Sequence, residues 1–279
     1  MALTAGASII WGTSFVATSV GLEYSNPYVL LFERFFIASI AILALGIFVR
    51  SARVWAELRR PRTWGIGGVY AAAFLLQFLG QNYSGASASA LLSNLFIVFV
   101  PVAAFFLLRE RLPNSSKAAV GVSVVGIVLV LPSGLQVTGT TLGDMLLVCA
   151  SLGYTLFIVL GKKYGVSSLA SSFALIVSMT VIMAPLAALE GGPLALSTVF
   201  TNTAWESVIW LGVPCTVVAL AMYARGLASI RATQSAALLL LEILVGVALS
   251  VALLGNALSL TQLLGASVIG FGILLSSRQ

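Results

Sequence analysis

Residues 86–111 read ASASALLSNLFIVFVPVAAFFLLRER, a long apolar run that ends in charged residues. No charged side chain occurs from residue 86 to residue 108, and the run then ends on Arg109, Glu110 and Arg111. About 20 predominantly apolar residues are enough for an α-helix to cross the hydrocarbon core of a bilayer. Basic residues directly after such a run are typical of its cytoplasmic end. The stretch therefore predicts a membrane-spanning helix.

The whole chain shares the composition of this stretch. Of its 279 residues 60% are hydrophobic and 8% are charged, and the mean hydropathy is +1.10. A soluble domain carries about 25% charged residues, so lipid must cover most of this surface. The apolar runs are too long and unbroken for the alternating strands of a barrel. We therefore expect an all-α integral membrane protein.

The length accommodates about ten such helices joined by short loops. The predicted helices are 3–22, 27–49, 64–83, 86–108, 117–132, 142–161, 168–189, 206–224, 232–254 and 261–277.

Basic residues follow every second predicted helix. Arg34 is the exception among the 14 Lys and Arg residues, because it lies inside a predicted span. Loops enriched in Lys and Arg face the cytoplasm, so we expect both termini on the cytoplasmic side. This sorting also accounts for the net charge of +6 without nucleic acid as a partner. The basic residues that we expect on the cytoplasmic side are Arg50, Arg53, Arg59, Arg60, Arg62, Arg109, Arg111, Lys117, Lys162, Lys163, Arg225, Arg231 and Arg278.

The chain resembles itself at a shift of about half its length. Gly121-Val-Ser-Val-Val-Gly126 matches Gly265-Ala-Ser-Val-Ile-Gly270. Identities between Gly80 and Leu92 recur between Gly226 and Leu238 at an offset of 146, the difference between 226 and 80. We expect two five-helix repeats, residues 1–135 and 136–279, in one membrane domain. An odd helix number inverts the second repeat, an arrangement frequent in transporters. Chance similarity between apolar segments is the alternative.

Several short motifs resemble those of a known family. They are Trp11-Gly12, Arg34-Phe35, Arg109-Glu110-Arg111-Leu112 and Gly143-Asp144. On these residues the chain resembles the ten-helix, EamA-type branch of the drug/metabolite transporter superfamily, and most of all its YddG-type exporters of aromatic and neutral amino acids. The resemblance implies a multi-pass protein of the bacterial inner membrane, with a cavity lined by predicted helices 1, 3, 4, 6, 8 and 9. Arg109 departs from the family glycine, and Asn256 from the glutamate of the second repeat.

Polar side chains inside a span need water or a partner, so they are candidates for substrate binding. On the third predicted helix Tyr70, Phe74, Gln77, Gln81 and Ser84 lie at i, i+4, i+7, i+11 and i+14 and share one face. This face predicts the wall of a hydrated cavity, although Gln and Ser also join packed helices.

Aromatic rings at midplane could hold an apolar substrate group or simply pack against neighbouring helices. Pro101 frees a backbone carbonyl, which makes it either a hinge candidate or a tolerated proline. The predicted substrate-binding residues are Trp11, Ser14, Phe74, Gln77, Gln81, Asn94, Tyr154, Phe157 and Glu242.

Glu242 lies near the middle of the ninth predicted helix, where an ionised carboxylate is costly. Three interpretations remain open: it binds the ammonium of an amino acid, it couples transport to protons, or it is a structural partner of Arg34. For Arg34 we expect a structural ion pair or snorkelling of the side chain to the surface.

These features together predict a secondary transporter that exports amino acids or similar small metabolites by alternating access. Efflux of cationic compounds is the alternative, because Glu242 and the aromatic rings could bind a cation. The chain has no His, no paired acids and no metal-ligand cluster, so we expect neither an enzyme nor a cofactor.

Overall fold

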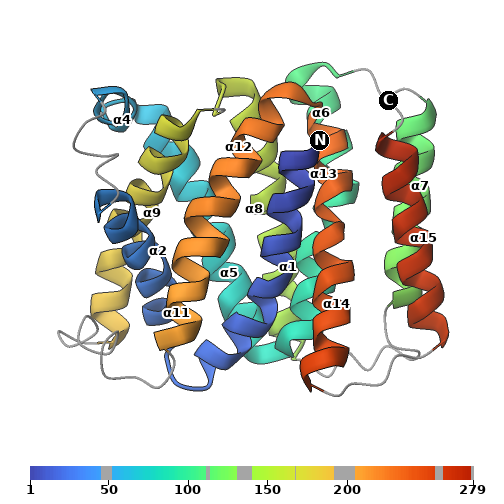
Figure 1. Ribbon diagram of the computed structural model, residues 1–279, viewed down its shortest axis with the longest axis horizontal. Coiled ribbons are helices and arrows are strands. Elements are labelled where there is room, and N and C mark those ends of the chain that lie inside the picture. Colours follow the sequence, from blue (N-terminus) through green and yellow to red (C-terminus); the bar gives the residue numbers. More distant parts are fainter. Residues whose placement is uncertain are drawn as a thin grey trace.

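The computed structural model describes residues 1–44, 52–110, 114–130, 140–166, 168–191, 205–254 and 260–277. Every regular element within these ranges is helical, as Figure 1 shows. The prediction of an all-α protein is therefore confirmed for the described residues.

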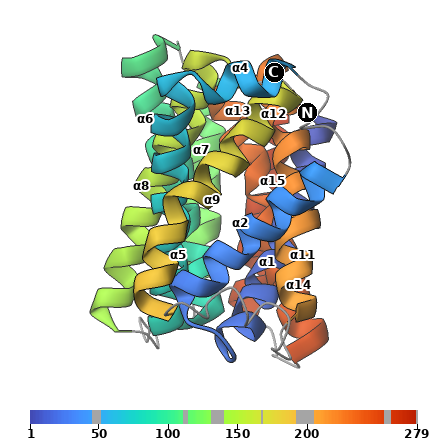
Figure 2. The same ribbon diagram turned by 90° about the vertical axis from the view of Figure 1, so that its left-hand side faces the viewer.

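The helices of the first half follow the predicted ranges, with one addition and with an interruption at residues 93–95 of the predicted helix 86–108. The addition is α4, which lies in the basic segment predicted as a loop and runs along one end of the bundle (Figure 2). Its Glu57 carboxylate pairs with Arg60 and Arg62. The elements are α1 (Ala2–Leu22), α2 (Pro27–Ala44), α4 (Ala52–Leu58), α5 (Pro61–Leu92), the 3-10 turn η1 (Ser93–Leu95), α6 (Phe96–Leu108) and α7 (Asn114–Val130).

The helices of the second half also follow the predicted ranges, but two of them are interrupted. The elements are α8 (Thr141–Tyr164), α9 (Leu169–Gly191), α11 (Trp205–Gly212), the π-helical segment η2 (Val213–Val218), α12 (Ala219–Ser229), α13 (Ala232–Leu239), α14 (Leu241–Leu254) and α15 (Leu260–Ser277). Residues 45–49 and 131–132 of the predicted helices lie outside the described ranges.

Three interruptions shape the middle of the bundle. At Gly85 the backbone is left-handed (φ 79°), which glycine adopts without steric cost, and the chain reverses there. At η1 the Asn94 amide donates to the carbonyl of Ala90 and Ser93 to that of Ser89, and such bonds to the preceding turn compete with regular α-helix. At Leu240 the helix tightens into i→i+3 hydrogen bonds, and the Ser8 hydroxyl donates to the carbonyl of Leu239.

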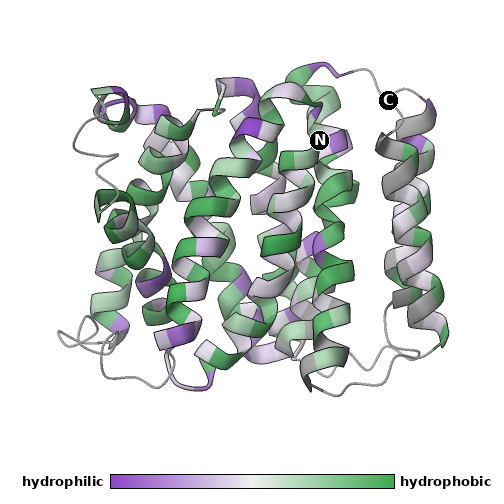
Figure 3. Cartoon of the chain, viewed as in Figure 1, coloured by the Kyte–Doolittle hydropathy of each residue, from purple (hydrophilic) through white to green (hydrophobic). Residues whose placement is uncertain are grey.

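Six of the described helices are long and apolar enough to cross a membrane by length and composition. Two shorter apolar helices, Ser93–Leu108 and Ala232–Gly246, add to them. Figure 3 shows apolar residues along the helices. Large apolar side chains such as Phe106 and Leu189 are exposed, as expected for a surface covered by lipid. The six ranges are Ala2–Leu22, Pro27–Ala44, Pro61–Ala86, Thr141–Tyr164, Leu169–Gly191 and Trp205–Ser229.

Helices from the two halves pack against each other throughout the bundle. α1 packs against α12 and α14, and α8 packs against α5 and α6. α2 packs against α9, while α7 and α15 form a pair at one edge, visible on the right of Figure 1. This mixing of the halves places the middle of α1, α5, α8 and α12, the start of α6 and the junction of α13 with α14 around one central cavity.

Candidate functional site

The central cavity lies where the interrupted helices meet the middle of α1, α5 and α8. The space open to the centre of a water molecule is about 50 Å³. One water needs about 10–15 Å³ on this measure, so several waters fit, or the part of a small molecule that replaces them. The lining residues are Trp11, Ser14, Tyr70, Phe74, Gln77, Ser93, Asn94, Phe96, Tyr154, Phe157, Ile158, Tyr223, Leu239 and Glu242.

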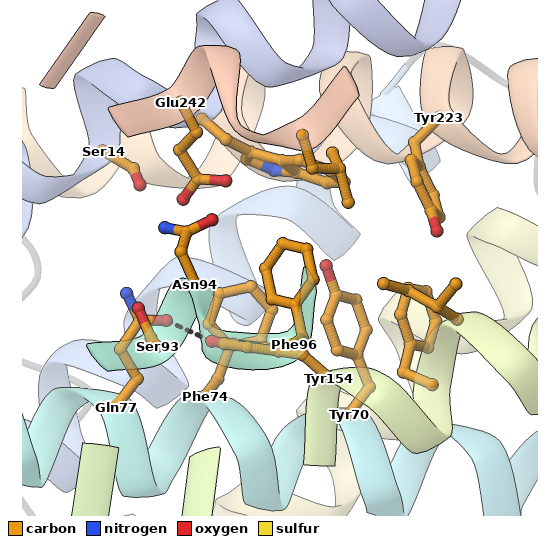
Figure 4. A pocket seen from close by; sticks show the side chains of 14 residues that line it. Ser14, Tyr70, Phe74, Gln77, Ser93, Asn94, Phe96, Tyr154, Tyr223 and Glu242 are labelled. Atoms are coloured by element: carbon orange, nitrogen blue, oxygen red, sulfur yellow. Dashed lines mark hydrogen bonds between the residues drawn. The ribbon is translucent and has the colours of Figure 1, made fainter. Parts of the chain in front are cut away.

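The lining is divided into a polar end and an aromatic wall, as Figure 4 shows. The polar end is Ser14, Gln77, Ser93, Asn94 and Glu242. The aromatic wall is Trp11, Tyr70, Phe74, Tyr154, Phe157 and Tyr223. A small amphipathic molecule matches this division, because each of its halves meets groups of its own polarity.

The rings of the aromatic wall fix one another. The centroids of Tyr70 and Phe157 are 3.7 Å apart, with the planes nearly parallel at 5°. Tyr223 extends the wall, because its ring centroid lies 5.3 Å from that of Trp11 and 6.0 Å from that of Phe157. Such aromatic contacts add to the stabilisation from apolar burial, so the wall is a rigid surface.

Two amides at the polar end are held by protein hydrogen bonds. The Tyr154 hydroxyl donates to Oε1 of Gln77, and Nδ2 of Asn94 donates to the carbonyl of Ala90 at 2.7 Å. Oδ1 of Asn94 is buried and has no hydrogen-bond partner in the described part of the chain. A buried acceptor without a partner is rare in native proteins and calls for an explanation.

The sequence predicted Glu242 near the middle of one continuous helix, 232–254. In the structure it lies instead in the first turn of α14, just after the interruption at Leu240. The N–H groups of a helix start carry a partial positive charge, which favours a carboxylate at this position. Glu242 and Arg34 are both described, and no ion pair joins them. The structure thus does not contain the Arg34–Glu242 pair that was one interpretation of this acid.

Arg34 is fully buried behind the aromatic wall. Its Nε donates to Oγ1 of Thr216 at 2.8 Å, and its Nη2 donates to the carbonyl of Cys215 at 3.4 Å. Its guanidinium lies 4.4 Å from the ring centroid of Phe74. The expected snorkelling to the surface is therefore wrong, because η2 and the ring supply partners inside the bundle. Trp11 Nε1 donates to the same Cys215 carbonyl at 2.7 Å.

The cavity brings together every predicted substrate-binding residue except Gln81. Nε2 of Gln81 donates to the carbonyl of Phe15 and to the hydroxyl of Ser19, each at 3.0 Å, and so joins α5 to α1 beside the cavity. Pro101 is buried within α6, outside the lining, and the helix continues through it. Its role as a hinge stays a prediction.

The sequence-based site residues omitted Tyr70, Ser93, Phe96, Ile158, Tyr223 and Leu239. Tyr70 belongs to the face of the third predicted helix that also carries Phe74 and Gln77, but it was not included among the predicted site residues. The internal repeat could have found Tyr223 and Phe96 from the predicted residues Gln77 and Glu242, because lining residues occur in pairs at the offset of 146. Tyr223 corresponds to Gln77 (223 − 77), Leu239 to Ser93 (239 − 93) and Glu242 to Phe96 (242 − 96).

Comparisons with known proteins agree with this architecture. The model of the EamA-like transporter family matches residues 1–131 and again residues 141–278. An Archaeoglobus fulgidus protein named an uncharacterized transporter is 28% identical over 241 residues, which cover 82% of this chain and 80% of that protein. A Salmonella typhimurium protein named a probable amino-acid metabolite efflux pump is 25% identical over 276 residues, 95% of this chain and 90% of that protein. A solved structure titled "Crystal structure of protein" superimposes with a TM-score of 0.77, covers 99% of this chain and 95% of its own, and is 17% identical.

Proposed function

The chain belongs to the EamA-like transporter family, and on that premise we propose that it is a secondary transporter exporting aromatic or other neutral amino acids, or similar small metabolites, by alternating access. The observation that carries the proposal is the central cavity, which joins one acidic side chain and two amides to a wall of aromatic rings. An amino acid with an apolar side chain offers the complementary halves.

The proposal includes ten spans arranged as two inverted repeats, residues 1–135 and 136–279. The two separate family matches support it. The packing supports it too. At the offset of 146, α1 corresponds to α8, α5 to α12 and α6 to α14. The contacts of α1 with α12 and α14 therefore have counterparts in the contacts of α8 with α5 and α6. Both halves also interrupt a helix at corresponding positions, η1 and Leu240, and paired interruptions of this kind mark binding sites in inverted-repeat transporters.

We further propose that the protein lies in the bacterial inner membrane with both termini in the cytoplasm. The start of α1, the end of α15 and α4, which lies in a segment rich in arginine, are at the same end of the bundle in Figure 1. Single-cysteine variants Arg59→Cys and Glu23→Cys test this topology with a membrane-impermeant maleimide on right-side-out vesicles. Labelling of Glu23→Cys alone is expected; labelling of Arg59→Cys before permeabilisation would contradict the orientation.

Efflux of cationic compounds is the second candidate. Glu242 favours it, because a carboxylate next to aromatic rings suits a cation. The wider set of polar groups favours the zwitterion, since a cation leaves the N–H groups of Gln77 without a charged partner.

Counterflow of labelled amino acids in proteoliposomes tests the proposal. Wild-type protein is expected to exchange labelled phenylalanine against unlabelled neutral amino acids with saturation. Glu242→Gln is expected to lower the rate at least tenfold, because it removes the charge that faces the substrate ammonium. Glu190→Gln, which alters an exposed carboxylate at the end of α9, is the matched control. Equal rates for the two variants would exclude a role of Glu242 in transport.

A further inference from the structure

The geometry points to two oppositely oriented amides as the device that selects a zwitterion. We propose that Gln77 presents its N–H groups to a substrate carboxylate, while Asn94 and Glu242 present oxygens to its ammonium. Tyr154 is then a positioning residue, because its hydroxyl sets the orientation of Gln77. This inference rests on the proposed function and names the chemistry by which the same cavity recognises its substrate.

The orientation of Gln77 follows from the hydrogen bond that it accepts. The Tyr154 hydroxyl donates to Oε1, so the amide oxygen is occupied and the NH₂ group is left for a ligand. Tyr154 is itself held edge-on to two rings of the aromatic wall, with centroids 5.9 Å away at Tyr70 and 5.6 Å away at Phe74. A rigid aromatic wall thus fixes a donor at the polar end.

The orientation of Asn94 is the reverse. Its NH₂ group is occupied by the bond to the carbonyl of Ala90, one turn earlier, so its oxygen is the free group. That oxygen is buried without a partner, and Figure 4 shows the Asn94 side chain between Gln77 and Glu242. Asn94 and Glu242 together therefore offer acceptors only, as an ammonium requires.

A ligand with both charges satisfies the donor and the acceptors at once. An amine without a carboxylate leaves the N–H groups of Gln77 unpaired, and an acid without an amine leaves Asn94 and Glu242 unpaired. A site built to hydrogen-bond a substrate group discriminates strongly against analogues that lack it, because its own buried groups then lose their partners. The aromatic wall is left for the side chain of the amino acid.

The test compares three ligands with the same ring: L-phenylalanine, phenethylamine and 3-phenylpropionate. Each competes for counterflow of labelled L-phenylalanine in proteoliposomes, which gives an inhibition constant. Wild-type protein is expected to bind L-phenylalanine at least tenfold more tightly than either analogue. Failure of wild-type protein to exchange any amino acid would instead overturn the proposed function itself.

Two variants then separate the roles of the amides. Tyr154→Phe keeps the ring and releases Gln77, so the affinity for L-phenylalanine should fall about tenfold while that for phenethylamine changes little. Gln77→Glu replaces the donor by a carboxylate and should reverse the preference toward phenethylamine. Gln77→Met, a neutral replacement of similar length, provides the same comparison if the glutamate variant does not fold.

The control is Tyr164→Phe, the same substitution at an exposed position near the end of α8. Its ratio of phenylalanine to phenethylamine affinity should equal that of wild-type protein. If Tyr154→Phe weakens all three ligands equally and the Gln77 variants keep the wild-type preference, the amides do not select the zwitterion and the inference is wrong. That outcome would leave amino-acid transport itself intact.

Discussion

Substitution of Gly12 by alanine tests how closely α1 and α14 must approach to form the cavity. A Cβ atom at Gly12 would lie 2.6 Å from Cβ of Val245 and 2.8 Å from the backbone oxygen of Glu242. Carbon atoms in contact are normally about 3.5–4.0 Å apart, so the added methyl group overlaps α14 by about 1 Å. A backbone oxygen and a Cβ cannot rotate away, so the helices must separate.

The expected result of Gly12→Ala is a loss of both stability and substrate affinity. Overpacking of this kind costs about 1–3 kcal/mol, which lowers the melting temperature of a chain of this size by roughly 2–10 °C. Movement of α14 also displaces Glu242, and Trp11 next to Gly12 moves with α1. The KM for counterflow should therefore rise. Both quantities are measured on purified protein, the melting temperature in detergent and the KM in proteoliposomes.

Gly65→Ala is the matched control, because a Cβ at Gly65 in α5 meets no atom within 4 Å. Alanine is a better helix former than glycine by about 0.5–1 kcal/mol, so this variant should melt at or slightly above the wild-type temperature. If Gly12→Ala has the same melting temperature and KM as Gly65→Ala, the close approach of α1 and α14 does not position the site.

Two further substitutions test polar contacts of one half-buried and one buried cation. Lys162→Met should lower the melting temperature, because Nζ donates to the carbonyls of Leu227 and Ile230 at 2.9 and 2.6 Å. Hydrogen bonds from a charged donor contribute about 1.5–3 kcal/mol to stability. Lys163→Met, at the neighbouring exposed position, is the control and should not change the melting temperature. Arg34→Lys should also destabilise the protein by about 1–3 kcal/mol. The guanidinium of Arg34 stacks on the ring of Phe74 while it donates a hydrogen bond in its own plane to Thr216, and a lysine cannot do both. An unchanged melting curve would refute this.

The helical ranges could be predicted because hydrocarbon imposes a length and a composition on each span. The interruptions at Gly85 and at Asn94 have local causes in the sequence, a glycine and two side chains that bond the preceding turn. The interruption at Leu240 occurs in a run of leucines that carries no such signal. The interruptions at Asn94 and Leu240 were both missed, since 86–108 and 232–254 were each predicted as one helix. With the second of them, the position of Glu242 in the first turn of a helix was missed as well.

Much of the cavity could be predicted because polar side chains within a span have few alternatives to a hydrated site. Gln81 shows the exception, since a carbonyl and a hydroxyl of α1 engage its amide. Arg34 shows why tertiary structure was needed, because its partners in η2 lie about 180 positions later in the chain. Hydropathy patterns contain no information on such distant contacts.

At two of the paired lining positions, the two halves of the chain carry side chains of opposite polarity. Ser93 is matched by Leu239 and Phe96 by Glu242, so the repeat in the sequence is not preserved in these side chains. A ligand consequently meets a cavity whose two ends differ in polarity. It would cross the protein in one fixed orientation, without turning end over end between uptake and release.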